Sequence, residues 1–375
     1  MIKLSRGDWM LSRFSVENYK CFEKKIIFDL TKVRDYSFNN FVIKNNIINK
    51  ALIYGKNASG KTSLGYAMFD IVDHLSDKKS NKRTAGYVNA NSKKSYSSFS
   101  YGFIFDNVRI TYKYKKNENR QLREEKLLID DKLVFHYDFE VKVIVKNLIE
   151  ETKQLRWKTK EDNVSAIRFM ISTIDLGDDN IVNKMFHFVN KMLWFKSLED
   201  VNDYIGYSSI SGNIDQYIFD KKLCNQLQEF LWKNDITEKL KIEMQGGKPI
   251  INFAFDKYNI PFKWIASSGT KSLLLIFYWM KFAFEDASLV FIDEFDAFYH
   301  HELSASIIDL LFSDNRFQVF VTSHNSSLIS NEKYRPDVYF QIGHSMIKSF
   351  SDMTRRGIRE AHSLEKMYKV GEFDF

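Results

Sequence analysis

The sequence predicts an α/β protein with a mixed central sheet, an antiparallel β subdomain and a mainly helical insertion. Strand-like apolar runs alternate with helical stretches in both terminal parts of the chain, which is typical of a mostly parallel core. Apolar residues alternate between residues 96 and 137, as in antiparallel strands, whereas helical stretches joined by polar connections follow. We expect an N-terminal lobe at residues 1–140, the insertion at 141–248 and a C-terminal lobe at 249–375.

The composition is that of a globular protein from a reducing compartment. The 375 residues are 44% apolar and 15% aromatic, which is enough to fill a large core. The two cysteines, Cys21 and Cys224, have no neighbours at metal-ligand spacing, which argues against disulfides and structural zinc. We find no signal peptide and no run of about 18 uncharged apolar residues, so we expect a cytoplasmic protein without a membrane segment.

The net charge of +7 is weak evidence for a nucleic-acid partner, because the excess is spread over the whole chain. The densest basic stretch is interleaved with Ser and Asn. It is interpreted first as a solvated loop, with nucleic-acid contact as the alternative. Its cations are Lys78, Lys79, Lys82, Arg83, Lys93 and Lys94.

The elements of the two lobes follow from their apolar periods. In the N-terminal lobe, residues 14–30 predict a hairpin, residues 41–54 lead into a strand and residues 63–75 have a helical period. In the insertion, we expect helical stretches such as 181–195 and 221–240, without a sustained heptad pattern. The C-terminal lobe predicts strands at 250–255, 289–292 and 318–322 and a helix at about 270–284.

A complete phosphate-loop pattern is the most informative motif. Residues 55 to 62 read G-K-N-A-S-G-K-T, directly after the apolar run 51–54 and before the helical stretch. Such a loop surrounds phosphates with backbone N–H groups, while Lys61 would reach the β and γ oxygens and the Thr62 hydroxyl would bind Mg²⁺. A glycine-rich turn before a helix is the simpler alternative. The residues expected at the nucleotide are Gly55, Asn57, Ser59, Gly60, Lys61, Thr62 and Ser63.

Two adjacent carboxylates follow the buried strand at 289–292, where an open α/β sheet binds its ligand. Asp293 is suited to hold Mg²⁺ through water, and Glu294 to polarise the water that attacks the γ-phosphate. An Asp-Glu pair is common at strand ends, so the pair becomes informative only together with the phosphate loop.

Two further segments complete the candidate site. Small hydroxyl residues from Ser267 to Thr270 lead into an apolar helix and predict an anion-binding helix start, although in isolation a simple Ser-rich cap is the better interpretation. His324 ends the strand at 318–322. A lone histidine there is usually structural, but its position after the carboxylate strand would let the imidazole contact a γ-phosphate or the attacking water.

The order of these parts resembles the ABC-type ATPases of the SMC and RecF kind. Residues 266–270 correspond to the L-S-G-G-Q signature, with Ser267 and Gly269 kept. The segments 293–300 and 363–373 are similar to bacterial ATP-binding proteins of the AAA_15/AAA_21 group. That group includes ATPase subunits of abortive-infection and phage-defence systems and relatives of the OLD nucleases. The chain departs from many ABC ATPases at His300, where they carry the D-loop aspartate.

The resemblance implies an ABC-type ATPase head that converts ATP to ADP and phosphate with Mg²⁺, using Glu294 and His324 as catalytic residues. It also implies a homodimer, or a higher oligomer, in which ATP is held between two protomers. Lys61 and Thr62 of one protomer would bind the ATP, and the partner's signature would cover it. The signature residues expected at the nucleotide are Ser267, Ser268 and Gly269.

The resemblance further implies a role in anti-phage defence, as a nucleotide-controlled sensor or scaffold. OLD nucleases carry a TOPRIM domain after the ATPase, and 51 residues follow His324 here, so we expect the effector to be a separate TOPRIM-like nuclease or toxin. The alternative is a RecF-like ATPase that binds DNA and acts in repair or maintenance. A transporter subunit fits poorly, because the insertion is long and the signature divergent.

Overall fold

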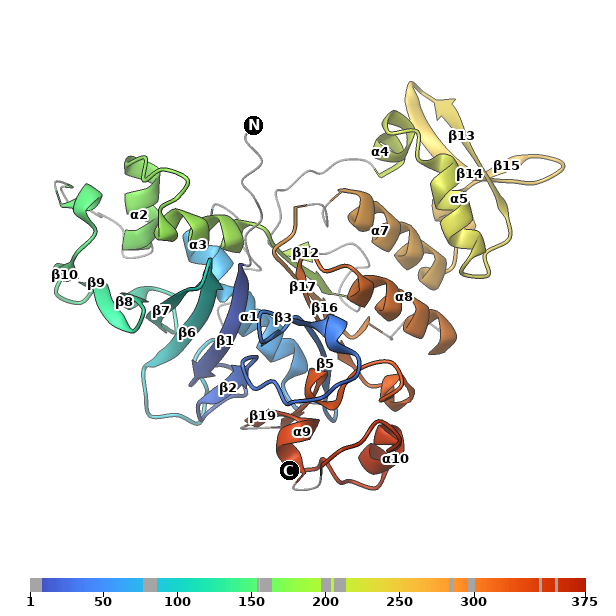
Figure 1. Ribbon diagram of the computed structural model, residues 1–375. Helices are drawn as coiled ribbons and strands as arrows, with labels where there is room; N and C mark the ends of the chain where they lie inside the picture. The colour runs from blue at the N-terminus through green and yellow to red at the C-terminus, as the bar shows by residue number, and fades with distance from the viewer. Residues whose placement is uncertain are drawn as a thin grey trace.

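The computed structural model describes residues 9–76, 86–153, 155, 164–196, 204–205, 214–282, 286–295, 301–343, 346–354 and 357–375. Two large sheets form the body, and helix α1 (Lys61–Leu75) lies between them (Figure 1). One face of α1 contacts the central sheet, where Gly65 packs on Trp194 and Phe291. On its other side the Ala67 carbonyl accepts a hydrogen bond of 2.7 Å from the Tyr101 hydroxyl of the antiparallel sheet.

The central sheet is mixed. Its described strands run in the order β12-β11-β16-β17-β5-β18-β19, with parallel pairs in the middle and antiparallel pairs at the two edges. Every residue of β5, β16 and β17 is buried, as expected for parallel strands covered on both faces. The strands are β5 (Lys50–Tyr54), β11 (Met192–Lys196), β12 (Tyr204–Ile205), β16 (Leu289–Asp293), β17 (Gln318–Ser323), β18 (Tyr339–Gly343) and β19 (Met346–Ser349).

The second sheet is antiparallel throughout, in the order β10-β9-β8-β7-β6-β1-β2. Its strand β6 buries every second residue, because alternate side chains of a strand point to opposite faces. The strands are β1 (Met10–Glu17), β2 (Ile26–Asp29), β6 (Tyr96–Phe105), β7 (Val108–Asn117), β8 (Leu122–Ile129), β9 (Lys132–Asp138) and β10 (Val143–Asn147).

The remaining elements surround these sheets. The short strands are β3 (Ile43–Lys44), β4 (Ile47–Ile48), β13 (Lys239–Gln245), β14 (Lys248–Ala254) and β15 (Asn259–Pro261). The helices after α1 are α2 (Ala166–Thr173), α3 (Ile181–Asn190), α4 (Ile214–Asp220), α5 (Cys224–Trp232), α6 (Phe262–Ile265), α7 (Ser268–Phe282), α8 (His301–Ser313), α9 (Phe350–Met353) and α10 (Leu364–Lys369). Helix α7 packs with α4 and α5, whereas α1 packs with α2 and α3.

The predicted fold class is confirmed, including the mixed sheet, the antiparallel subdomain and the opening hairpin of β1 and β2. Two expected helices are partly wrong. Helix α3 ends at Asn190, and residues 192–196 form β11, which pairs in parallel with β16 in the central sheet. The expected helix at 221–240 is also shorter, because α5 ends at Trp232 and β13 begins at Lys239. The domain boundaries at residues 140 and 248 stay a prediction.

None of the helices in the described part of the chain has the length and apolar composition needed to span a bilayer. Two features named from the sequence fall outside the described residues. They are His300 and the basic residues Lys78, Lys79, Lys82 and Arg83.

Candidate functional site

The phosphate loop has the backbone that its glycines and small residues predict. It connects β5 to α1, and Ala58 and Gly60 both adopt positive φ, of 61° and 106°. Inside the loop, the Lys61 ammonium donates to the carbonyl oxygens of Gly55 at 2.8 Å and Lys56 at 3.2 Å. The lysine is therefore buried and held at the N-terminus of α1, where a helix favours negative charge.

Close packing fixes the loop from outside. A Cβ at Gly55 would lie 2.7 Å from the carbonyl oxygen of Ile342 in β18. A Cβ at Gly60 would lie 2.6 Å from the Phe22 ring and 3.0 Å from the Cys21 sulfur. These two contacts leave no room for a side chain, so the sequence needs glycine at both positions.

The loop residues fit a bound phosphate chain. The Ser59 hydroxyl is buried and has no hydrogen-bond partner among the described residues, which leaves it for a bound group. Across the described chain, no cluster of three or more His, Cys, Asp or Glu side chains could hold a metal ion. Magnesium held by the Thr62 hydroxyl and Asp293 would take its other ligands from water and phosphate oxygens, as this ion usually does.

The carboxylate strand and the histidine strand are neighbours. Strand β17 lies between β16 and β5 and is parallel to both, so the C-terminal ends of the three strands lie side by side. Asp293, His324 and the phosphate loop are all at this end of the sheet. The His324 Nε2 lies 3.9 Å from the Glu294 Oε1, and both side chains are partly exposed. The structure thus brings the two predicted catalytic residues together.

Thr322 holds both Asp293 and Glu294 at this end of the sheet, and the sequence analysis missed it. Its hydroxyl donates to the Asp293 carboxylate at 2.7 Å and accepts the Glu294 backbone N–H at 2.7 Å. Glu294 itself has φ of 49°, a left-handed conformation that costs a non-glycine residue about 1 kcal/mol. A hydroxyl residue at the end of the strand beside the carboxylate strand was the signal that could have revealed Thr322.

The predicted signature forms an exposed helix start. The Ser267 hydroxyl accepts the backbone N–H of Thr270 at 3.1 Å, so Ser267 caps α7. Ser267 and Ser268 are exposed and Gly269 is partly exposed. The geometry agrees with the simple cap, and it leaves the end of the helix accessible to a partner.

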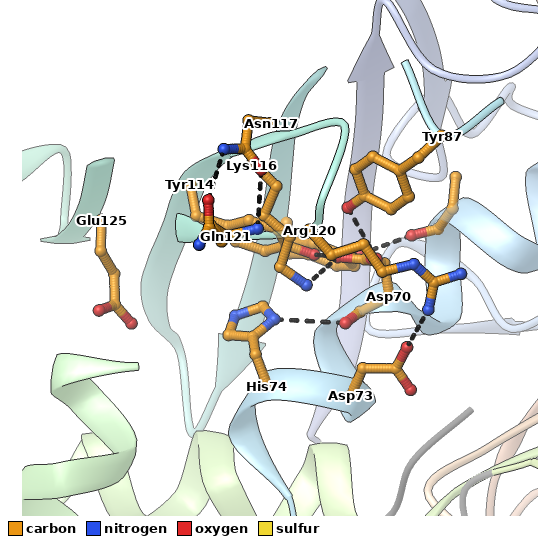
Figure 2. A network of polar contacts seen from close by, with 12 residues as sticks. Asp70, Asp73, His74, Tyr87, Tyr114, Lys116, Asn117, Arg120, Gln121 and Glu125 are labelled. Atoms are coloured by element: carbon orange, nitrogen blue, oxygen red, sulfur yellow. Dashed lines mark hydrogen bonds and ion pairs between the residues drawn. The ribbon is translucent and has the colours of Figure 1, made fainter. Parts of the chain in front are cut away.

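A buried polar network anchors the far half of α1 to the antiparallel sheet (Figure 2). The Asp70 carboxylate accepts hydrogen bonds from Tyr87 at 2.8 Å, Tyr114 at 2.8 Å and the Lys116 ammonium at 2.7 Å. Burial raises the pKa of the Tyr87 and Tyr114 hydroxyls well above their usual value, so both keep their protons. The helix that follows the phosphate loop is thereby tied to β7.

The network continues to α2. His74 Nε2 lies 2.9 Å from the Tyr112 hydroxyl, and Tyr112 donates to Glu125. Burial lowers the pKa of His74 and raises the pKa of Glu125. Glu125 also accepts from the Ser165 hydroxyl and from the Ala166 N–H at the start of α2. One chain of contacts thus joins α1, β7, β8 and α2.

Several solved structures are similar in fold. The SMC head domain from Thermotoga maritima is 12% identical with a TM-score of 0.45, over 90% of this chain and 98% of that chain. An Smc head domain with an extended coiled coil bound to the C-terminal domain of ScpA, derived from Pyrococcus furiosus, is 12% identical with a TM-score of 0.47, over 97% and 99%. The recombination mediator protein RecF with ATP is 13% identical with a TM-score of 0.41, over 91% and 99%.

No curated protein matches the chain. A family model does match, over residues 50–330, from β5 through the phosphate loop to the segment after His324. Its description is "AAA domain, putative AbiEii toxin, Type IV TA system". The resemblance to the AAA_21 group is therefore confirmed. Because the match covers well over half of this chain, the chain belongs to the AAA_21 family.

Proposed function

We propose that this protein binds and hydrolyses ATP at the C-terminal ends of the neighbouring strands β5, β17 and β16. The observation that carries the proposal is the meeting of Glu294 and His324 beside the strand that ends in the phosphate loop. The loop supplies an anion-binding helix N-terminus, and the carboxylate and imidazole supply groups that can orient a water molecule. Membership of a family of AAA domains supports the same activity.

The chain's own residues divide the work. Lys61 would contact the β and γ phosphates as a fixed cation, and the Ser59 hydroxyl would donate to a phosphate oxygen. Glu294 would orient the attacking water, and His324 would contact the γ-phosphate or that water. Thr322 is a positioning residue, because it holds the Asp293 carboxylate and the Glu294 backbone. Magnesium, when bound, would neutralise charge on the phosphates.

Two substitutions test the activity. Glu294→Gln keeps the shape of the side chain but not its negative charge, so ATP should stay bound while turnover falls about 10²- to 10⁴-fold. Lys61→Ala should abolish nucleotide binding, because it removes the cation inside the loop. Phosphate release and binding of a fluorescent ATP analogue measure the two effects. Glu332→Gln, on an exposed turn, is the control. Equal turnover in Glu294→Gln and the parent would show that another group activates the water.

We further infer that ATP controls the association of this protein with a separate effector, a toxin or a TOPRIM-like nuclease, in anti-phage defence. The family description names a toxin of a type IV toxin–antitoxin system, which supports an effector that acts in such a pair. The net charge of +7, although spread over the chain, gives weak support to the second candidate, direct binding of DNA, because cations release counterions from phosphates.

One experiment separates the two roles. The Glu294→Gln variant, loaded with ATP, is tested with the product of the neighbouring gene and, separately, with duplex DNA at two salt concentrations. An effector scaffold should retain the neighbour's product, and Lys61→Ala should lose it. A DNA-binding ATPase should instead show affinity that falls steeply with salt. Retention of the neighbour by Lys61→Ala would contradict nucleotide control.

A further inference from the structure

The chain segment 364–375 reaches both loops of the candidate nucleotide site, although it lies far from them in sequence. Helix α10 forms the first half of the segment, and residues 370–375 follow it beside α9 (Figure 1). Helix α10 packs against the 3-10 helix Ser326–Leu328, which begins two residues after His324. The residues after α10 approach the phosphate loop. The segment therefore contacts both loops.

Aromatic stacking anchors this segment. Phe373 is 1% exposed, and its ring stacks on Phe350 with centroids 4.0 Å apart and planes 10° apart. Tyr368 of α10 lies 5.7 Å from the ring of Tyr54, the last residue of β5 before the phosphate loop. Such ring pairs add to the burial of apolar area, so the anchor is strong.

Beyond the anchor, two side chains reach the loop itself. The Asp374 carboxylate lies 3.5 Å from the ammonium of Lys56. The Phe375 ring covers Gly343, where a Cβ would lie 2.6 Å from a ring carbon. Gly343 follows Ile342, whose carbonyl oxygen blocks the Cβ position of Gly55. The Phe375 ring therefore packs on the end of β18, and the end of β18 packs on Gly55, the first glycine of the loop.

We propose that segment 364–375 is a positioning element of the nucleotide site, an inference that rests on the proposed ATPase function. Phe375 holds the end of β18 against the phosphate loop, and α10 holds the loop that follows His324. A loop already held in its binding conformation loses less freedom when a ligand arrives, so the element raises affinity. The exposed Lys56–Asp374 pair contributes little, because solvent screens such pairs.

Phe375→Ala tests the proposal without threatening the fold, because the side chain is 51% exposed. We expect the KM for ATP to rise between about 2-fold and 10-fold, the loss of one aromatic contact. We also expect faster amide exchange at residues 55–60 without nucleotide, an unchanged unfolding midpoint, and rescue by Phe375→Tyr. Asp374→Asn should change KM less than about 2-fold. Phe255→Ala, 45% exposed and between β14 and β15, is the matched control.

Gly343→Ala provides a second, independent variant. The three atoms nearest to the new Cβ all belong to the Phe375 ring, the closest at 2.6 Å, so the substitution should displace that ring and reproduce the KM of Phe375→Ala. The double variant should then be no worse than either single variant, because both remove the same contact.

The outcomes separate this inference from the proposed function. A parent protein that binds no ATP overturns the ATPase proposal, and amide exchange at residues 55–60 alone then decides whether the segment holds the loop. If the parent binds ATP and Phe375→Ala matches it in KM and exchange, the positioning role is wrong. A fall in unfolding midpoint that accounts for the loss, or an equal loss in Phe255→Ala, would also refute it.

Discussion

Asp70 and Lys116 form a fully buried ion pair between α1 and β7, with side chains only 3% exposed. Removing two charges from water is expensive, and their mutual attraction compensates only when further hydrogen bonds satisfy the remaining atoms. The hydroxyls of Tyr87 and Tyr114 supply those bonds to the carboxylate. The pair therefore specifies how α1 sits on β7 more than it stabilises the fold.

This interpretation predicts strongly coupled mutations. Asp70→Asn leaves Lys116 buried beside a neutral amide, and Lys116→Met leaves a buried carboxylate without a cation, so each should lower the free energy of unfolding by about 3–5 kcal/mol. The double variant buries neither charge, so its loss should be smaller than the sum of the single losses. Urea denaturation measures all three values.

A matched control lies on the same strand. Arg109 and Asp131 form a pair at 3.0 Å whose side chains are 62% and 70% exposed. Arg109→Ala should therefore change the free energy of unfolding by no more than about 1 kcal/mol. Additive losses for the buried pair would mean that the two charges do not depend on each other.

At the scale of elements, the local pattern of the sequence was sufficient for most of the fold. Alternation identified β6 to β9, and the helical period identified α1 to within two residues of its start. Strand β11 was missed because a short run of four apolar residues has no period that separates a buried strand from a buried helix. Its pairing with β16 depends on residues almost a hundred positions away, which no local pattern contains.

The candidate site likewise contains residues that the sequence could identify and residues that it could not. The phosphate loop, Asp293 and Glu294 are contiguous motifs, so the sequence could identify them and even predict that His324 lies close. Thr322 and Phe375 act through contacts between distant segments, and their residue types are ordinary at those positions. Only the fold brings such residues to the site. The position of Thr322 near the end of a strand could have suggested it, whereas no local pattern could assign Phe375.

At the scale of the whole molecule, the two parts of the expected nucleotide site, the phosphate loop and the signature, differ in how exposed they are. Lys61 is buried in its own loop, whereas Ser267 and Ser268 at the start of α7 are exposed. A two-fold axis would let each protomer present its α7 end to its mate's phosphates, because such an interface uses the same two surfaces twice.

We therefore expect ATP to dimerise the protein. Glu294→Gln with ATP and magnesium should elute as a dimer in size-exclusion chromatography with light scattering, and as a monomer without nucleotide.

A bulky, negative side chain at the exposed helix start would repel the phosphates of the partner's ATP. Ser268→Glu in the Glu294→Gln background should therefore stay monomeric with ATP, while still binding a fluorescent analogue through its own phosphate loop. Met244→Glu, at a side chain that is 55% exposed on β13, is the control and should leave the dimer intact. If Ser268→Glu dimerises as well as its parent, α7 does not cover the nucleotide, and the sandwich arrangement is wrong even if ATP is bound.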